Sequence, residues 1–452
     1  MKQVLYNYDI YPKAFLGDRE QLITIQPLGG HNKFKVGHTY TVETYKLSEG
    51  DPANYPERPA SVKIDVIPDE DGCIRFTNVF CGEGEHRVNI YLNRGEKPRV
   101  ALSVYSLNAD MAGRIPQRGD LHVHTSRSDA REAPETVCAN YRGHGYDFMV
   151  ISDHYKYYPS LEAIEYYKGI TDLNIVQGEE VHLPLNDVHY VNFGGSYSIN
   201  ALVKPSQNEE MAGDDLKYRS FDGKAPDPMT KEEFIEMIKE RAKSVPRENE
   251  SERLSFAVIE WVYEHVKAGG GLGIFPHPYW LCPANQLPED YTRFVYERMP
   301  FDAFEVLGGE NYYSHNGFQT GLYYEMRMKG FDPPVVGSTD SHGSTEHNRN
   351  ALICSTIVFA KENTPYGIIS AVKEKYSIAV DTISAEYRLV GDFRLMRYAS
   401  FLMENYFPLH DLACKTEGYF MNRYVANDPL ASEVLKMLKG QIPAMQKKYF
   451  NV

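Results

Sequence analysis

Cysteine and tryptophan are scarce in this chain of 452 residues, which contains six cysteines and two tryptophans. The cysteines are widely separated, and no pair has the short spacing that is typical of a structural zinc knuckle. We therefore expect reduced, mostly buried thiols, as in a cytoplasmic protein. The six positions are Cys73, Cys81, Cys138, Cys282, Cys354 and Cys414.

Long apolar runs are also missing. The stretch MKQVLYNYDIYPKAF has no apolar core of signal-peptide length, and no run approaches the roughly 20 apolar residues that a membrane span needs. Basic residues are outnumbered, with 48 Lys and Arg against 62 Asp and Glu, and the net charge is −14. This charge argues against undirected binding to nucleic acid or to anionic membranes, so neither is expected as a partner.

Residues 1–115 have the pattern of a β module. Short runs rich in β-branched and aromatic residues, such as HTYTVETYKL (38–47) and RVALSVYSL (99–107), are separated by turn signals. Because no long helical segment interrupts them, they predict a small antiparallel β-sandwich. The module has no concentration of histidine or aspartate, and we interpret it as a packing or binding module appended to something else.

From Gly119 onward, short apolar runs alternate with helical patterns. GDLHVHT (119–125) and YDFMVISDH (146–154) are strand-like, whereas APETVCANYRGHG (133–145) and SFAVIEWVYEHVKAGGG (255–271) are helical. Such alternation predicts parallel strands in a barrel or in an open α/β sheet. We place this second domain at residues 116–385.

Two further segments differ from this alternation. Residues 206–253 are rich in charge and predict an insertion, which is either a lid over one end of the sheet or a solvated surface excursion. Residues 386–452 predict a helical extension that is apolar and aromatic on one face. This face is expected to pack on the barrel or on a partner subunit, so a homo-oligomer is plausible.

Histidines and carboxylates recur where the predicted strands end. His122 and His124 are two residues apart and therefore share one face of a strand, so both can bind one ion, whose nitrogen ligands lie at about 2.0–2.1 Å. Active sites of parallel barrels form where strands end, and imidazole with carboxylate ligands is typical of catalytic zinc, manganese or iron. The other strand-end candidates are Asp129, Asp153, His154, Glu179, Glu180, His189, His277, Asp340 and His342.

The ordered motifs HVHTSRSDA, SDH, GEE, an isolated histidine, PHP and STDSH resemble those of the polymerase-and-histidinol-phosphatase (PHP) superfamily of metallohydrolases. The resemblance extends from about Gly119 to about Asp381. The preceding β module and the late segment with SDSHG, IVFA and IISAVKEKYSIAVD are most similar to the carbaryl-hydrolase-like branch. The resemblance implies a distorted (β/α)7 TIM-like barrel, the PHP fold, with two or three divalent ions, zinc, manganese or iron.

The resemblance also implies how ligands are shared. Glu179 and Glu180 face opposite sides of a strand, and the family's spacing selects Glu180. The sequence departs from the family at Ala130, which is often glycine, and at Tyr155, where many relatives have asparagine; the first change is expected to be harmless, and the second leaves the family's substrate specificity open for this chain. The implied ligands are His122, His124, Glu180 and Asp340 for one ion, Glu180, His189 and His277 for a second, and Asp129, His154 and His342 for a third.

Other polar residues have two open interpretations each. Arg127 and Lys156 are either contacts for a phosphate or carboxylate of the substrate or ordinary surface cations. Asp153 is interpreted as an acceptor that orients a ligand histidine. His144 and His182 are expected at the surface or in support of the ligands, whereas the remaining candidates lie either in the pocket or at the surface: His315, His347, Asn311 and Tyr279.

These features favour a metal-dependent hydrolase, specifically a phosphoesterase that acts on a small, anionic molecule. Clustered divalent ions activate a water molecule as the nucleophile and stabilise the leaving oxygen. No G-x-S-x-G motif is present, so no side-chain nucleophile is assigned. The alternatives are hydrolysis of a carboxyl ester, carbamate or amide at the same site, and a metal-binding scaffold without catalytic activity.

Overall fold

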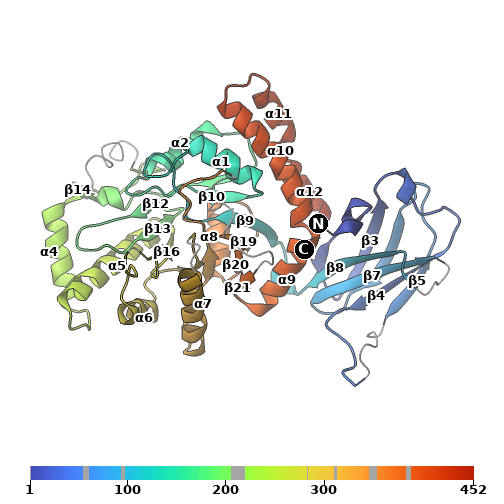
Figure 1. Ribbon diagram of the computed structural model, residues 1–452, viewed down its shortest axis with the longest axis horizontal. Coiled ribbons are helices and arrows are strands. Elements are labelled where there is room, and N and C mark those ends of the chain that lie inside the picture. Colours follow the sequence, from blue (N-terminus) through green and yellow to red (C-terminus); the bar gives the residue numbers. More distant parts are fainter. Residues whose placement is uncertain are drawn as a thin grey trace. The chain divides into compact units, whose positions relative to one another are not determined.

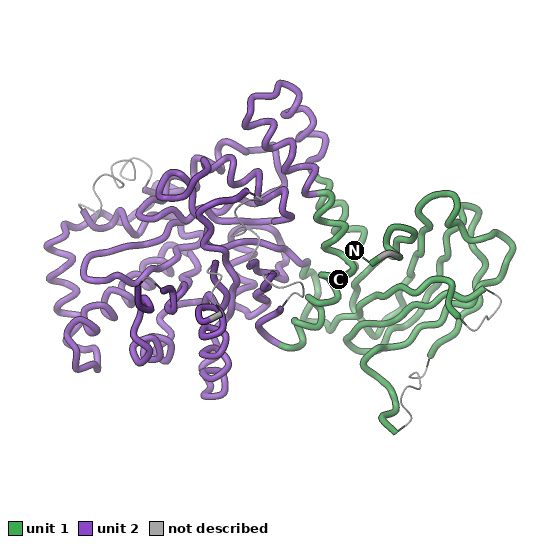
Figure 2. Tube along the Cα trace, in the orientation of Figure 1, with its two compact units in different colours: residues 1–115, 393–413, 440–452 green, residues 116–392, 414–439 purple. Residues whose placement is uncertain are grey.

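The structure is a computed structural model that describes residues 2–53, 61–92, 97–204, 219–281, 283–309, 313–345, 354–382 and 388–452. The chain divides into two compact units, which Figure 2 shows in green and purple. Unit 1 comprises residues 1–115, 393–413 and 440–452, and unit 2 comprises residues 116–392 and 414–439. The C-terminal region therefore contributes to both units, and each unit is described by itself.

Unit 1 contains two sheets that share one core (Figure 1). One has the strand order β1-β3-β6 and the other the order β22-β2-β8-β7-β4-β5. Ile25 of β3, Val42 of β4 and Val104 of β8 are buried in the same cluster, which makes a sandwich of the two sheets. The strands are β1 (Tyr8–Tyr11), β2 (Ala14–Leu16), β3 (Glu20–Pro27), β4 (Tyr40–Lys46), β5 (Val62–Val66), β6 (Ile74–Val79), β7 (Gly84–Leu92), β8 (Val100–Leu107) and β22 (Phe450–Asn451).

The last residues of the chain are fixed to the first strand of unit 1. The ammonium group of Lys13 is fully buried 3.2 Å from Asp9 Oδ1, and Asp9 Oδ2 accepts hydrogen bonds from Lys448 at 2.6 Å and from Tyr449 at 3.0 Å. Strand β22 pairs in parallel with β2. Helices α9 (Phe393–Asn405) and α12 (Gln441–Tyr449) also belong to this unit, as does the first part of α10 (Phe407–Val425).

Unit 2 is a mixed α/β structure with two main sheets. Their strand orders are β11-β10-β9-β19-β20-β21 and β12-β13-β16-β17-β18. Val150 of β10, Val191 of β13 and Ile274 of β16 belong to one buried cluster, so both sheets face a common core. The strands are β9 (Ile115–Asp120), β10 (Phe148–Val150), β11 (Asn174–Val176), β12 (Gly178–Val181), β13 (Tyr190–Phe193), β16 (Leu272–Phe275), β17 (Ala303–Leu307), β18 (Val335–Gly337), β19 (Cys354–Ala360), β20 (Ser377–Asp381) and β21 (Arg388–Val390).

The expected closed (β/α)7 barrel is not confirmed. Within the described ranges, the strands of unit 2 form open sheets, and two isolated parallel bridges link residues beyond their ends, Val123 with Ser341 and His154 with Glu180. The strands are also not all parallel, because β13 runs antiparallel to both β12 and β16. The short loop between β12 and β13 explains this reversal, since a parallel crossover needs about a dozen residues or more.

Helices cover the sheets of unit 2, and the charged insertion is part of that layer. Residues 205–218 lie outside the described part of the chain. The remainder forms β15 (Met229–Thr230), which pairs with β14 (Val203–Lys204), and α4 (Lys231–Ala242), which begins with a capping box between Thr230 and Glu233. Phe234 of α4 packs edge-on against Trp261 of α5 (Glu250–Ala268), with ring centroids 5.1 Å apart, so α4 is a packed helix rather than a solvated excursion.

The other helices of unit 2 are α1 (Pro134–Gly143), α2 (Tyr158–Tyr166), α6 (Glu289–Arg298), α7 (Tyr313–Met328), α8 (Pro365–Lys373) and α11 (Ala431–Leu438), and α10 (Phe407–Val425) has residues in both units. Arg142 of α1 is fully buried and donates to Glu417 of α10 at 2.8 Å. None of the described helices is long and apolar enough to span a membrane.

Candidate metal centre

The nine predicted ligands all lie in unit 2, where close contacts link their side chains into one cluster. β9 and β18 end at Asp120 and Gly337, so their ligands follow the strands rather than lying within them. The amide of Asp340 donates to the His122 carbonyl at 2.9 Å, and that of His124 donates to the Ser341 carbonyl at 3.0 Å. These backbone bonds hold the two ligand-bearing segments side by side.

His189 precedes its strand, whereas most of the other ligands follow theirs, and the reversed direction of β13 explains the difference. Val191 of β13 is opposite Glu180 of β12 and opposite Ile274 near the end of β16. The first residue of an antiparallel strand thus lies at the same edge as the last residue of its neighbour. His189 is therefore brought to the edge where β16 delivers His277.

Four donor groups lie close together within the cluster. His124 Nε2 lies 2.9 Å from Asp340 Oδ1 and 3.4 Å from Glu180 Oε2, and His122 Nε2 lies 3.3 and 3.5 Å from the same two oxygens. The two Nε2 atoms are 3.2 Å apart. Neighbouring ligands of one ion with bonds of about 2.1 Å are separated by roughly 3.0–3.5 Å. These residues could therefore hold one divalent ion.

Glu180 and Asp340 each present their two oxygens to different histidines. Glu180 Oε2 faces His122 and His124, whereas Oε1 lies 2.7 Å from His189 Nδ1 and 3.5 Å from His277 Nε2. Asp340 Oδ1 faces His122 and His124, and Oδ2 lies 3.9 Å from His277 Nε2. Carboxylates placed in this way could bridge two ions, as two-metal sites require.

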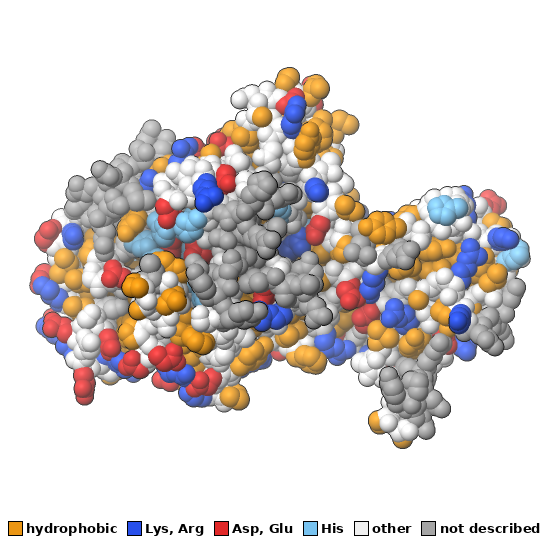
Figure 3. Space-filling view, in the orientation of Figure 1, with side chains coloured by type: hydrophobic (Ala, Val, Ile, Leu, Met, Phe, Trp, Pro, Cys, Tyr) orange, Lys and Arg blue, Asp and Glu red, His pale blue; other side chains and the backbone are white. Residues whose placement is uncertain are grey.

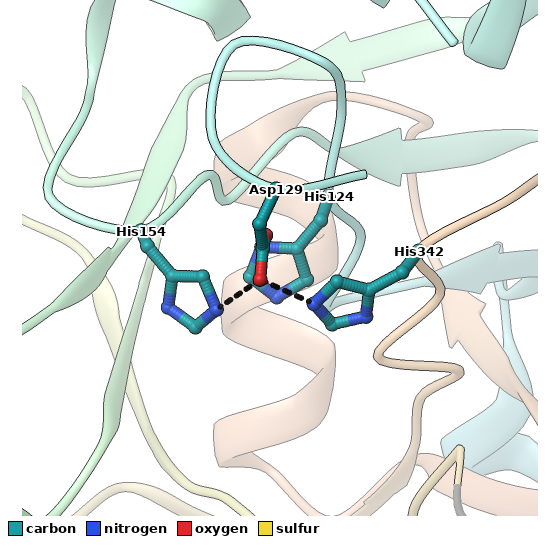
Figure 4. Close-up of side chains that lie close together, drawn as sticks. All are labelled: His124, Asp129, His154 and His342. Atoms are coloured by element: carbon teal, nitrogen blue, oxygen red, sulfur yellow. Dashed lines mark ion pairs between the residues drawn. The ribbon is translucent and has the colours of Figure 1, made fainter. Parts of the chain in front are cut away.

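A third donor group surrounds Asp129 (Figure 4). Asp129 Oδ2 lies 3.2 Å from His342 Nε2 and 3.6 Å from His154 Nε2. The rings of His154 and His342 stack on that of His124, with centroids 4.3 and 4.4 Å away. The side chains of His342 and Asp129 are 36% and 51% exposed, so this part of the cluster is open to solvent, and pale blue histidine atoms are visible on the surface of unit 2 in Figure 3.

The donor set fits divalent ions because it contains buried polar atoms that nothing in the described chain satisfies. Both oxygens of Glu180, Nδ1 of His189 and Nε2 of His277 are buried without a hydrogen bond of good geometry. Unsatisfied buried polar groups are costly and rare in folded proteins. Ligation by an ion would satisfy these atoms together.

Three of the histidines have one nitrogen fixed by a hydrogen bond, which leaves the other directed at the cluster. Nδ1 of His122 lies 3.1 Å from Glu305 Oε2, that of His277 lies 3.2 Å from Gln286 Oε1, and that of His342 lies 2.9 Å from the Asp340 carbonyl. An N–H on Nδ1 can donate in each case, so that Nε2 presents its lone pair to an ion.

Charge pairing within the cluster shifts the pKa values of its members. Burial alone would raise the pKa of Glu180 and Asp340, but the surrounding histidines hold the pKa of both carboxyls well below its usual range. Burial lowers the pKa of His122, but Asp340 and Glu180 raise it well above the ordinary value. The pKa of His342, beside Asp129, is raised to about 9. Because metal ligands must be deprotonated, ions would displace these protons on binding.

Glu305 is a buried carboxylate that the sequence analysis did not single out. It lies within the otherwise apolar strand β17 (AFEVL), is fully buried, and contacts the Nδ1 of His122. Carboxylates in this position orient ligand histidines in many metal sites. A charged residue inside a buried apolar run was the available signal, because such residues are almost never buried without a partner.

Two acidic residues beside predicted ligands turn away from the cluster. Asp153 was expected to orient a ligand histidine; instead it accepts hydrogen bonds from Thr125 Oγ1 at 2.6 Å and Ser128 Oγ at 2.5 Å, and so holds the loop before Asp129. Glu179 accepts from Ser198 Oγ at 2.7 Å on the opposite face of β12 from Glu180. The strand alternation that separated the two glutamates is present in the structure.

His182 lies closer to the cluster than expected. Its Nε2 is 2.7 Å from His154 Nδ1 and 3.7 Å from Glu180 Oε2, and the three side chains form a possible donor group of their own. Burial lowers the pKa of His182 to about 3. Glu180 and His182 are two residues apart at the end of one strand, which is the same signal as the pair His122 and His124.

The two predicted anion contacts are already paired with protein groups. The guanidinium of Arg127 binds Glu162 of α2, with its Nε 2.9 Å from Oε2, and Lys156 Nζ donates to the Arg127 carbonyl at 2.6 Å. Both cations border the cluster in sequence, but neither contacts a ligand side chain through a described bond. Their role in binding substrate stays a prediction.

The remaining candidates lie in different places. His144 Nε2 is 3.4 Å from the Ser344 carbonyl and Tyr279 donates to Glu289, so both are engaged away from the ligands. His315 is buried and lies 2.8 Å from Gln319 Oε1. Asn311 and His347 lie outside the described residues.

No family model and no curated protein match the chain. Among solved structures, it is similar to a two-domain protein of Bacteroides vulgatus described as containing a predicted PHP-like metal-dependent phosphoesterase, at 16% identity over 65% of this chain and 71% of that one, with a TM-score of 0.41. It is also similar to an amidohydrolase of Chromobacterium violaceum solved with bound sulfate and no metal, at 13% identity over 50% and 87% of the two chains, with a TM-score of 0.30. Likenesses this distant do not assign a family, so PHP membership and the carbaryl-hydrolase-like branch stay predictions, and the case for a metal centre is geometric.

Proposed function

We propose that the protein is a metal-dependent hydrolase, and specifically a phosphoesterase, with two or three divalent ions of zinc, manganese or iron. The observation that supports it is the convergence of nine donor residues from separate strand ends, at separations that suit shared ions, with buried donor atoms left unsatisfied. The proposed ligands are His122, His124, Asp129, His154, Glu180, His189, His277, Asp340 and His342.

The charge of the donor set favours an anionic substrate. Six neutral imidazoles and three carboxylates carry a charge of −3, so two divalent ions leave the centre at +1 and three leave it at +3. A concentrated positive charge in a cleft raises the local concentration of anions and stabilises negative charge that develops in a transition state. The phosphate group of a phosphoester meets both conditions.

The chain's residues would position the ions, and the ions would supply the electrophilic chemistry of the reaction. Divalent ions in such a site provide an activated water molecule and neutralise charge on the leaving oxygen. Glu180 and Asp340 would each be able to hold two ions, because the two oxygens of each carboxylate face different histidines. Glu305 and Gln286 fix the tautomers of His122 and His277, so that these rings present a lone pair rather than a proton.

Hydrolysis of a carboxyl ester, carbamate or amide is a second candidate, and one observation favours it. Arg127 and Lys156, the cations predicted to bind the anion, are engaged by Glu162 and by a backbone carbonyl. A neutral carbonyl substrate needs no such cation, since a metal ion can polarise the carbonyl oxygen.

The test is an assay of the purified, metal-loaded chain against aryl phosphate monoesters, aryl phosphate diesters and aryl carboxyl esters. Turnover of the phosphoesters is expected, and turnover of the carboxyl esters alone would contradict the phosphoesterase proposal. Elemental analysis after reloading with manganese or zinc is expected to give at least two ions per chain. Less than one ion per chain would contradict both hydrolase proposals, whereas full metal content without turnover of any ester would favour the metal-binding scaffold.

A further inference from the structure

A row of aromatic rings borders the donor cluster on one side. Tyr155 stacks on His182 with centroids 4.5 Å apart and ring planes at 29°. His182 meets His189 edge-on at 4.3 Å, and His189 lies 6.2 Å from Trp280 at 34°. All four side chains are partly exposed, with 11% exposure for His182 and 19% for His189, whereas Glu180, which both histidines contact, is fully buried. The row is therefore a partly accessible border beside a buried set of donors.

Tyr155 holds its place in the row at the cost of an unfavourable backbone conformation. Its φ of +62° lies in the left-handed region, which glycine and asparagine occupy readily and bulky residues rarely adopt. The amide of Tyr155 donates to the Glu180 carbonyl at 3.1 Å, which fixes this turn. Such strain is typical of ligand-binding sites, where the side chain has a role that the backbone alone does not explain.

The site repeats this strain at two of the proposed ligands. His277 and Asp340 also have positive φ, at +27° and +46°. Tyr155, His277 and Asp340 share this feature inside the site, and the other described residues besides glycine that have positive φ are exposed: Asp18, Leu185, Met299, Lys375 and Asn427.

Trp280 reaches the other end of the row from a second ligand-bearing loop. Its amide donates to the His277 carbonyl at 2.9 Å, and its ring lies 6.4 Å from that of His277. The chain has two tryptophans, and the other, Trp261, is buried in the hydrophobic core of unit 2. Trp280 is thus half-exposed beside a proposed metal ligand, a position in which a large flat side chain can contact a substrate.

We propose that Tyr155, His182 and Trp280 form a subsite for a planar aromatic or heteroaromatic group of the substrate, beside the bond that is hydrolysed. The inference builds on the proposed hydrolase function and adds a substrate class to it. Aromatic side chains bind flat rings through offset and edge-to-face contacts, and they lose little conformational freedom in doing so. A saturated ring of the same size cannot make these contacts.

The test compares two ligands that differ only in the flatness of their ring. Benzylphosphonate and cyclohexylmethylphosphonate have the same charged group and similar length, and neither is hydrolysed. Calorimetry with the manganese-loaded full chain is expected to show benzylphosphonate binding roughly three- to tenfold more tightly, the range that aromatic pairs give. Tyr155→Asn, which suits the left-handed backbone, and Trp280→Leu should each bring the ratio close to one, whereas Tyr155→Phe should preserve it.

Equal affinities in the unaltered chain, or binding of neither ligand, would overturn the subsite, as would a preference that survives both ring-removing variants. Metal content is measured in every variant, so that a loss of ions is not mistaken for a loss of stacking. Because the measurement needs no turnover, its result is separate from the proposed activity. A chain that prefers the benzyl ligand yet hydrolyses carboxyl esters alone would retain the subsite and contradict the phosphoesterase proposal.

Discussion

At the scale of single residues, Asp340 combines two properties that are rarely required together. It has a left-handed backbone at φ +46°, and its carboxylate faces His122, His124 and His277. Aspartate and asparagine tolerate this region better than other non-glycine residues, because their short polar side chains can bond locally. Removing the charge without disturbing the backbone is therefore possible with asparagine, whereas alanine would add strain.

We predict that Asp340→Asn lowers metal content by at least one ion per chain and lowers turnover by more than about a hundredfold, since even indirect partners of a metal site are worth 10–100-fold. Circular dichroism should show an intact fold. Asp227→Asn, at an exposed aspartate of the same unit, is the matched control and should bind ions normally. Full metal content in Asp340→Asn would show that Asp340 is misassigned.

Glu305 is predicted to act on the metal through His122. Glu305→Leu should weaken metal affinity about 10–100-fold, because Nδ1 of His122 would lose its acceptor and the ring its fixed orientation. Glu305→Gln retains a carbonyl oxygen at the same place and should recover most of the affinity. Competition against a chelator measures the metal affinity of both variants. Identical metal affinities of Glu305→Leu and Glu305→Gln would exclude an orienting role for Glu305.

His86 of β7 provides a pH test far from any metal ligand in sequence. It is buried with Nε2 2.8 Å from Ser106 Oγ, and burial followed by the charge of Lys46 lowers its pKa to about 4. The unfolded chain binds this proton near pH 6.5, so stability is lost as the pH falls below 6.5, and the loss levels off near pH 4.

Between pH 7 and pH 5 this histidine should remove about 2 kcal/mol from the free energy of unfolding of unit 1. His86→Gln has no titrating ring and should show a smaller loss over the same range. Hydrogen exchange of peptides from β7 and β8 measures the difference. Equal losses in both proteins would show that His86 does not cause the acid sensitivity.

At the scale of elements, the close approach of the loops after β17 and β18 places Asp340. A Cβ atom at Gly309 would lie 1.4 Å from the carbonyl oxygen of Thr339, the residue before Asp340. No rotamer change can relieve a clash with backbone. The glycine is therefore needed for its small size, and the ligand position depends on it.

Gly309→Ala is accordingly predicted to lower both metal content and melting temperature. Gly317→Ala is the matched control, because a Cβ atom there meets nothing within 4 Å and the residue lies inside helix α7. Alanine is favoured over glycine in a helix by about 1 kcal/mol, so the control should be slightly stabilised with unchanged metal content. A normal melting temperature and normal metal content in Gly309→Ala would contradict the proposed dependence.

Which elements could be predicted from sequence depended on whether the signal was local. RVALSVYSL (99–107) contains the whole of β8, because the alternation of apolar and polar residues in a strand is a local signal. The donors at strand ends were also visible, since strand ends lie at one edge of a sheet. The pairing of β22 with β2 could not be predicted, because the two residues of β22 are too few to form a pattern that indicates a neighbouring strand.

The same limit applies within the site. Glu179 and Glu180 are neighbours in sequence, and their placement on opposite faces of one strand followed from strand geometry. The contact of Glu305 with His122 joins residues 183 positions apart, and nothing local in either stretch specifies it. The antiparallel direction of β13 was also not predicted, although the residues between Val181 and Tyr190 are too few for a parallel crossover.

At the scale of the whole molecule, the proposed metal ligands are confined to one unit. All nine lie between residues 122 and 342, whereas unit 1 is formed by residues 1–115, 393–413 and 440–452. Unit 1 instead has a buried ionic network around Asp9 and Lys13, which no ion is needed to satisfy. The two units therefore have separate sources of stability, although the chain passes repeatedly between them.

Removal of metal is expected to affect these two sources differently. Ions that bind the folded form alone stabilise unit 2 by RT ln(1 + [L]/Kd), about 2.7 kcal/mol when the free ion is at a hundredfold excess over Kd. Both tryptophans, Trp261 and Trp280, lie in unit 2, so their fluorescence reports its unfolding. Chelation should lower the midpoint temperature of the unfolding transition that tryptophan fluorescence follows, and it should leave hydrogen exchange in β7 and β8 unchanged. Added manganese should restore the midpoint temperature. A fluorescence transition unmoved by chelator, or an equal loss of protection in β7 and β8, would contradict a metal centre that stabilises unit 2 alone.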